Sequence, residues 1–175
     1  MVALCLVALA CTACSVTHVS ARGPSLGVGT QIFPAAERTP APDLRGSTIN
    51  GTSLDLADEL GHGPVAVNVW ASWCGPCRQE MPVLAHAAGT ALRVVGIDER
   101  DSSRSARRFA RSHGAHYPNL ADPEGKLLAQ LRMLPQTGVP STVFLDRQGR
   151  VAARVVGPVA RPVLNRILRA LGASS

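Results

Sequence analysis

The chain has 175 residues, 46% of them hydrophobic and 17% charged, which suits one well-buried domain with a tail and is too short for two ordinary domains. Its formal net charge is +6, but the arginines are scattered through the second half of the chain. A basic block typical of nucleic-acid binding is therefore missing. Aromatic residues make up only 3%, which leaves little to stack on single-stranded bases. We expect one domain that binds no nucleic acid.

Residues 1–14 form a candidate signal or lipoprotein segment. The nearly continuous apolar run over residues 2–13 suits an export signal and is shorter than the about 20 residues that span a bilayer. No Lys or Arg precedes it, so either the signal is weak or the true start codon lies upstream. Cys11 and Cys14 each follow small residues and resemble a bacterial lipobox, although neither has Leu three places earlier.

We expect lipidation at Cys14, with Cys11 as the alternative, because Cys14 leaves the longer apolar run and is followed by a polar stretch. One acyl chain binds membranes only marginally, so a stable anchor needs the further chains that bacterial lipoproteins carry. The expected location is extracytoplasmic, at the outer face of the cell membrane. A cleaved, secreted form and an uncleaved one remain as alternatives.

Residues 15–39 are rich in small residues and proline without an apolar period, which predicts a flexible tether before a folded domain over residues 40–173. In that domain, strand and helix patterns alternate, as in α/β proteins. A hairpin is expected over residues 44–56, turning at Asn50-Gly51. Further strands are predicted at residues 65–70, 92–97, 141–145 and 151–156. Helices are predicted from the mid-chain cysteines to residue 86 and over residues 103–112, 122–131 and 160–171.

Cys74 and Cys77 are the one close cysteine pair outside the apolar segment, so they form a redox pair, half of a metal site or two bystanders. A thiol attacks a disulfide only as its thiolate, and the unpaired N–H groups at a helix N-terminus stabilise that anion. If the helix begins at the pair, Cys74 is the nucleophile and Cys77 the resolving thiol.

Three neighbours of the pair are candidate substrate-contacting residues. Pro76 can occupy a first helical turn without losing a hydrogen bond. Gly75 leaves space beside the sulfur, and Trp73 provides an apolar wall near Cys74. Trp70, the other tryptophan, is expected to pack into the core.

Competing interpretations of the pair are weaker. Covalent haem attachment needs His after the second cysteine, where this chain has Arg78. Structural zinc needs four ligands, and one C-x-x-C supplies two. The histidines that could complete such a site show no spacing tied to Cys77; they are His62, His86, His113 and His116. We expect no metal and no organic cofactor beyond the redox-active disulfide itself.

The run VAVNVWASWCGPCRQEMP at residues 65–82 resembles the active-site segment of the thioredoxin superfamily, and most closely its TlpA/ResA-like exported branch. Residues 41–43 with the hairpin, Glu80, and the run GVPSTVFLD at residues 138–146 fit that branch too. The resemblance covers about residues 40–171. It implies a thioredoxin-like three-layer sandwich with a central mixed β-sheet, an N-terminal hairpin and a central insertion between residues 99 and 134.

The resemblance also implies a cis peptide bond between Val139 and Pro140 beside the disulfide, which would leave the backbone of Val139 free to pair with an extended substrate. An ordinary trans turn is the alternative. Asn68 stands where cytoplasmic thioredoxins carry an acid, so proton transfer to Cys77 falls to Glu80, one helical turn away. Alternatively, Glu80 is only a surface carboxylate in the first helical turn.

The resulting hypothesis is a thiol–disulfide oxidoreductase that acts on exported protein thiols and disulfides. A reductant is favoured, as in cytochrome c maturation, with apocytochrome c as a possible partner and a membrane thiol donor or acceptor. An oxidase of folding proteins is the first alternative. A thiol peroxidase is disfavoured because it needs a different cysteine pattern. A non-enzymatic lipoprotein that binds partners through the cis-proline face is the remaining alternative.

Overall fold

The computed structural model describes residues 29–173. Their centre is a six-stranded sheet in the order β1-β8-β7-β4-β5-β6. β4, β5 and β6 run parallel, whereas β7 is antiparallel to β4 and β8, and β1 is antiparallel to β8, which makes the sheet mixed. The bounds are β1 Gly29–Ile32, β4 Val65–Trp70, β5 Arg93–Glu99, β6 Asn119–Asp122, β7 Ser141–Leu145 and β8 Val151–Val156.

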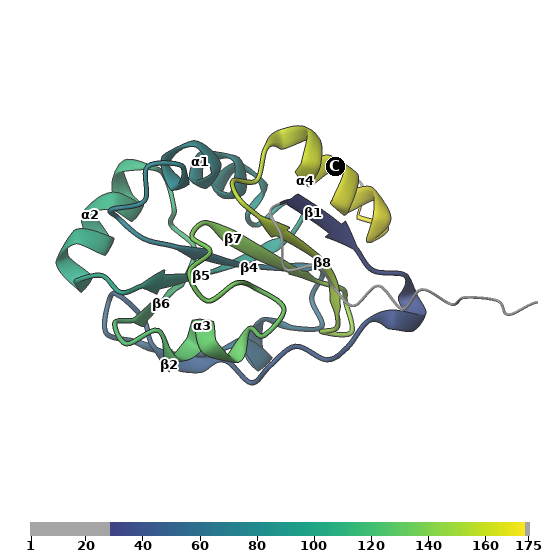
Figure 1. Ribbon diagram of the computed structural model, residues 1–175, viewed down its shortest axis with the longest axis horizontal. Coiled ribbons are helices and arrows are strands. Elements are labelled where there is room, and N and C mark those ends of the chain that lie inside the picture. The colour runs from purple at the N-terminus through teal and green to yellow at the C-terminus, as the bar shows by residue number, and fades with distance from the viewer. Residues whose placement is uncertain (1–28, 174–175) are drawn as a thin grey trace, which may run out of the picture.

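Helices cover both faces of this sheet (Figure 1). One face carries α1 Cys77–Ala87, α2 Ser103–Ser112 and α4 Arg161–Ala170. The other carries α3 Lys126–Gln130 and the hairpin of β2 Arg45–Ser47 with β3 Ser53–Asp55. Two short 3-10 turns, η1 Ala35–Glu37 and η2 Leu56–Glu59, complete the described elements. The expected three-layer α/β sandwich, its N-terminal hairpin and its insertion are confirmed.

The central strand β4 is apolar at every position except Asn68, because both of its faces are buried. Side chains alternate between the faces of a strand, so Val65, Val67 and Val69 pack into the core with α3 and the hairpin. Ala66 and Trp70 pack into the core with α1, α2 and α4. A sheet covered on both faces leaves no position for the polar half of an alternating pattern. The same alternation points Asn68 towards α1.

The predicted tether is corrected by the structure over residues 29–39. Gly29–Ile32 is strand β1, paired antiparallel with β8 at the edge of the sheet, and Phe33 N–H continues the pairing by donating to Ala152 O over 2.8 Å. β1 is held at the sheet edge by backbone hydrogen bonds, and these require no alternation of apolar side chains. The small-residue composition of this segment therefore gave no strand pattern to detect. Residues 15–28 and the candidate signal segment with Cys11 and Cys14 lie outside the described residues.

The predicted insertion between residues 99 and 134 contains α2, β6 and α3. Ser102 caps α2 by accepting the Ser105 N–H over 3.2 Å. Asp122 caps α3 from the end of β6, where its Oδ2 accepts N–H groups of Leu127 and Leu128 over 3.0 and 2.9 Å. β6 itself was not predicted, because its four residues follow a loop and carry two polar side chains.

Trp70, the last residue of β4, is held rigidly before the cysteine loop begins. Its indole Nε1 donates to Asn119 Oδ1 over 2.9 Å, and its ring stacks on Phe109 of α2 with centroids 5.5 Å apart. Gly96 allows this arrangement because any Cβ there would overlap the Asn119 side chain and the indole nitrogen. Trp70 is fully buried, as predicted, and gives the loop that follows a fixed starting point.

Candidate active site

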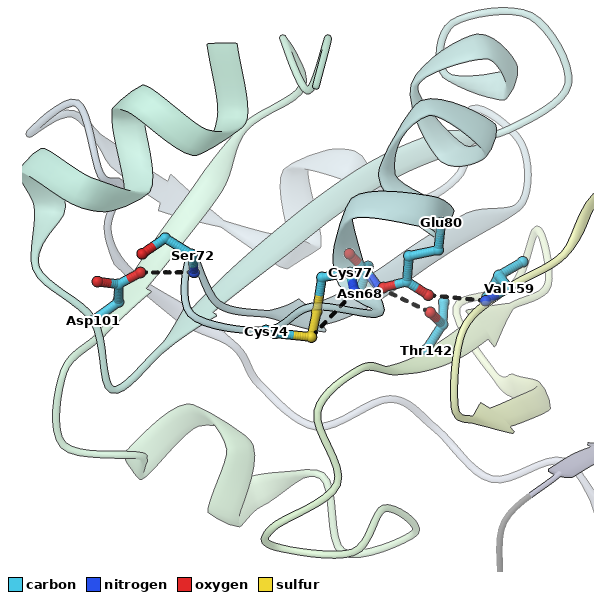
Figure 2. The surroundings of a disulfide bond; sticks show 8 residues. All are labelled: Asn68, Ser72, Cys74, Cys77, Glu80, Asp101, Thr142 and Val159. Atoms are coloured by element: carbon cyan, nitrogen blue, oxygen red, sulfur yellow. Dashed lines mark hydrogen bonds between the residues drawn. A yellow bond between two sulfur atoms is a disulfide. The ribbon is translucent and has the colours of Figure 1, made fainter. Parts of the chain in front are cut away.

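The two cysteines close a disulfide in the loop that joins β4 to α1, with Sγ atoms 2.06 Å and Cα atoms 5.4 Å apart. Cys74 N–H donates to Ala71 O over 3.1 Å, which folds the loop into a turn. The backbone N–H of Cys77, the first residue of α1, donates to Cys74 Sγ over 3.2 Å (Figure 2). The N-terminus of the helix thus points at Cys74, the place where a thiolate gains most from it.

Exposure separates the roles of the two sulfurs. Cys77 is 0% exposed and Cys74 3%, so only Cys74 offers any surface to an approaching sulfur atom. Gly75 and Pro76 are exposed beside the pair, and Trp73 stands out with 59% of its surface accessible. This agrees with Cys74 as the attacking thiol and with Trp73, Gly75 and Pro76 as the surface that surrounds it; their contact with substrate stays a prediction.

Glu80 is buried beside the pair rather than displayed on the surface. It lies three residues after Cys77, so the two share a face of α1, and it is only 1% exposed, which rules out the surface-carboxylate alternative. Asn68 Nδ2 donates to its Oε1 over 2.8 Å and Val159 N–H to its Oε2 over 2.9 Å. Burial raises the pKa of Glu80 to about 7, because the two donors only partly offset the loss of water.

The two partners of Glu80, Asn68 and Val159, come from segments that are far apart in the sequence (Figure 2). Asn68 lies on β4 and also donates to Thr142 Oγ1 of β7 over 3.0 Å, and Val159 lies between β8 and α4. Sequence reasoning did not assign Thr142 or Val159 to the site. A usable signal exists for Asn68, because an amide inside an otherwise apolar strand must find hydrogen-bond partners when buried.

The Val139–Pro140 peptide bond is cis, as the resemblance implied. Its position follows from the register, because Ser141 pairs with Val69 and the proline therefore adjoins the end of β4 from which the cysteine loop starts. Pro140 is buried, whereas Val139 is half-buried and packs against the core on both faces of the sheet, so Val139 is the more accessible of the two. Its pairing with a substrate backbone stays a prediction.

In the part of the chain that the structure describes, no histidines or acids are grouped with the cysteine pair as a metal site would require. Over residues 29–173, no three His, Cys, Asp or Glu side chains are grouped so as to hold a metal ion. His113 instead stacks on Phe109, with ring centroids 4.2 Å apart. In the same part of the chain, no helix combines the length and the apolarity needed to cross a bilayer.

Comparisons with known proteins place this geometry in a family. The model of the AhpC/TSA family matches residues 38–154. The chain is 33% identical over 136 residues to the thiol:disulfide interchange protein HelX of Rhodobacter capsulatus, covering 75% of this chain and 73% of HelX. It is 26% identical over 134 residues to the thiol-disulfide oxidoreductase ResA of Bacillus subtilis, covering 74% and 73%.

Among solved structures, a secreted thiol-disulfide isomerase of Corynebacterium glutamicum superimposes with a TM-score of 0.75 at 30% identity, covering 86% of this chain and 95% of that one. The family match includes both cysteines, Glu80 and the cis-proline segment. These similarities agree with the helix N-terminus aimed at Cys74 and the disulfide to Cys77. The chain therefore belongs to the AhpC/TSA family of the thioredoxin superfamily and is a TlpA/ResA-like thiol–disulfide oxidoreductase.

Proposed function

We propose that this oxidoreductase works as a reductant of disulfides in exported proteins, with Glu80 as the proton acceptor of its resolving step. One observation carries the proposal: Glu80 is buried on the same face of α1 as Cys77, and its pKa of about 7 lies where proton exchange with a thiol is effective. A carboxylate of ordinary pKa is a much weaker base. The proposed mechanism therefore uses Cys74 as a stabilised nucleophile and Glu80 as an internal base.

The proposed reaction has two exchange steps. The Cys74 thiolate attacks one sulfur of a substrate disulfide, forms a mixed disulfide and releases the first substrate thiolate. Cys77 then passes its proton to the Glu80 carboxylate and attacks Cys74 Sγ, which releases the second substrate thiolate and closes the Cys74–Cys77 disulfide. The substrate gains two electrons and the enzyme loses two. A membrane thiol donor must return them before the next cycle.

Direction is tested by the redox potential of the Cys74–Cys77 pair, measured in glutathione or dithiothreitol buffers. The Cys-Gly-Pro-Cys sequence favours a reductant, so we expect a value near the about −270 mV of thioredoxin. A value near the about −120 mV of the oxidase DsbA would instead assign the chain to disulfide formation.

Apocytochrome c is the proposed substrate, in keeping with the TlpA/ResA-like resemblance. Its haem-attachment sequence, C-x-x-C-H, must be reduced before haem is joined to it. A synthetic peptide with this sequence, oxidised to its internal disulfide, should be reduced faster than insulin by the dithiol enzyme. Equal or slower reduction of the peptide would remove apocytochrome c as the preferred substrate.

We also propose that the enzyme is held outside the cytoplasm by lipid on Cys14, which lies beyond the described residues. The small residues before this cysteine and the polar stretch after it support the proposal. Cells expressing the chain should incorporate radioactive fatty acid into it. Label that persists after Cys14→Ser and disappears after Cys11→Ser would move the anchor to Cys11, and label that survives the double substitution would refute lipidation at either cysteine.

A further inference from the structure

The loop that carries Cys74 is held on the side away from Glu80 by the segment that follows β5. Asp101 Oδ2 accepts the backbone N–H of Ser72 over 2.8 Å, two residues before the nucleophile (Figure 2). Its other oxygen, Oδ1, accepts the N–H of Ser102, the cap residue of α2, over 2.7 Å. One carboxylate therefore joins the start of a helix to the redox loop.

A second contact ties the next residue of the loop to the same segment. Trp73 Nε1 donates to Arg100 O over 3.3 Å. Ser72 and Trp73 are the two central residues of the turn closed by Cys74 N–H and Ala71 O. Hydrogen bonds to residues 100 and 101 thus hold both central residues of the turn. The conformation of this turn determines where the Cys74 side chain points.

The backbone at Arg100 is held in a costly conformation that brings these acceptors to the loop. Arg100 has φ of 49° and is the one non-glycine residue with positive φ over residues 29–173. Left-handed backbone is unfavourable for residues with a Cβ and persists only where the surroundings impose it, most often at functional sites. Here it places Arg100 O and the Asp101 carboxylate on the same side, facing Ser72 and Trp73.

Asp98, on β5, is a hydrogen-bond partner of the Asp101 carboxylate. It is 1% exposed and pairs in register with Trp70, the last residue of β4. Burial, followed by the charge and hydrogen bond of Asp101 and the charges of Glu99 and Asp122, raises the pKa of Asp98 to about 8. At pH 7 Asp98 is therefore mostly protonated and can donate its proton in the hydrogen bond to Asp101.

We propose that Asp101 is a positioning residue of the redox reaction, which holds the Ser72 amide so that Cys74 Sγ stays against the N–H of Cys77. This rests on the redox role of the cysteine pair. When the contact is lost, the turn relaxes, Cys74 Sγ leaves the helix N-terminus and its thiolate loses stabilisation. Asp101 acts through the geometry of the loop, since its negative charge alone disfavours a thiolate nearby.

The test compares three variants of the reduced full chain, in which Cys5, Cys11 and Cys14 are replaced by serine. Asp101→Ala removes the acceptor and the charge, whereas Asp101→Asn removes the charge but keeps one acceptor oxygen for Ser72. Asp55→Ala is the matched control, because Asp55 likewise accepts a backbone N–H, that of Ala57 over 2.9 Å, but lies in the hairpin and η2 region. The rate of iodoacetamide alkylation at Cys74 is followed against pH by mass spectrometry of its peptide.

For Asp101→Ala we expect the apparent pKa of Cys74 to rise by about 1 and its alkylation at pH 7 to slow about tenfold. This is the size of effect expected when the thiolate loses one hydrogen bond, because hydrogen bonds to charged groups are the stronger ones. Asp101→Asn keeps the acceptor and loses a nearby negative charge, so its pKa of Cys74 should be equal to the wild-type value or lower. Asp55→Ala should keep the wild-type profile. Equal profiles in all variants, or a lower pKa of Cys74 in both Asp101 variants, would overturn the proposal.

If Asp101→Ala fails to fold, as judged by circular dichroism, Asp101→Leu takes its place, because it also lacks an acceptor for the Ser72 N–H but retains side-chain volume. A raised pKa of Cys74 in Asp101→Leu supports positioning, and an unchanged or lowered one contradicts it. Alkylation needs no substrate. The alkylation result therefore remains interpretable even if the chain is an oxidase or does not act on apocytochrome c.

Discussion

Glu80 and Asp98 are two buried carboxyl groups that flank the same redox loop, and each is 1% exposed. Glu80 receives N–H donors from Asn68 and Val159. Asp98 has acidic neighbours instead, and its Oδ1 has no hydrogen-bond partner among the described residues. Burial raises the pKa of both groups, to about 7 for Glu80 and about 8 for Asp98.

The difference separates a group that can exchange protons from one that holds structure. Donors to Glu80 bring its two protonation states close to balance near neutral pH, which is what a proton acceptor for Cys77 requires. Asp98 faces acids, and with its pKa of about 8 it is mostly protonated at pH 7, so it can donate a hydrogen bond to Asp101. We therefore expect substitutions at the two positions to act on different steps.

The largest effect on turnover is expected from substitution of the two cysteines, which lie in the redox loop that Glu80 and Asp98 flank. Cys74→Ser should reduce insulin-disulfide reduction to the uncatalysed rate, because the nucleophile is lost. Cys77→Ser should also stop turnover, but after one step, so a mixed disulfide between Cys74 and substrate should accumulate in non-reducing mass spectra. Full turnover by the Cys74→Ser variant would refute the enzymatic assignment of the pair.

Next in size is the kinetic contrast between the two carboxyls. Glu80→Gln should slow turnover about 100-fold above pH 7 and flatten its pH dependence, because no internal base remains for Cys77. Asp98→Asn should keep the shape of the profile between pH 5 and 7, where the Asp98 carboxyl is mostly protonated, since an amide N–H replaces the carboxyl proton that faces Asp101. Turnover is measured with insulin from pH 5 to 9. A profile of Glu80→Gln that matches the wild type would remove its role in proton transfer.

The same carboxyls should make the fold less stable as pH rises. A folded-state pKa above the unfolded one means that the native chain binds more protons, so the free energy of unfolding falls between the two values. For Glu80 this window runs from about 4.5 to about 7 and is worth about 3 kcal/mol. Urea unfolding at pH 5 and pH 8 should show the loss in the wild type and a smaller loss in Glu80→Gln. Equal losses would show that Glu80 is unperturbed.

The smallest expected effect comes from the donor to Glu80. Asn68→Ala should cost about 1–3 kcal/mol of stability and raise the pKa of Glu80 further, because a donor that lowers it is gone. The pH profile of turnover should then move to higher pH. Thr142→Val is the matched control, since it removes the other partner of the Asn68 amide and keeps the bond to Glu80. A shift of the profile in the control alone would contradict this assignment.

The nucleophile, the resolving thiol, the central strand and the helix that follows could all be predicted because their signals are local. Glu80 could be proposed from its spacing to Cys77 but its burial could not, since that depends on Val159, 79 residues away. Strand β1 escaped prediction for a similar reason: its partner β8 lies more than a hundred residues further on, and backbone pairing leaves no side-chain pattern.

Residues 100 and 101 left no sequence signal either. Their role depends on a positive φ at Arg100 and on contacts across the loop with Ser72 and Trp73, and neither follows from residue type. Sequence patterns thus identified the two sulfur atoms that react. The groups that set their protonation and the orientation of Cys74 became visible only when the fold brought distant segments together.

The most direct test of the central claim is the titration of the Glu80 carboxyl carbon by ¹³C NMR in the disulfide form, with Glu80→Gln used to assign the signal. Burial beside the cysteine pair predicts a midpoint near the pKa of about 7. A midpoint near the ordinary 4.5 of a glutamate would contradict the account, because Glu80 would then be ionised throughout the neutral range and too weak a base to serve Cys77.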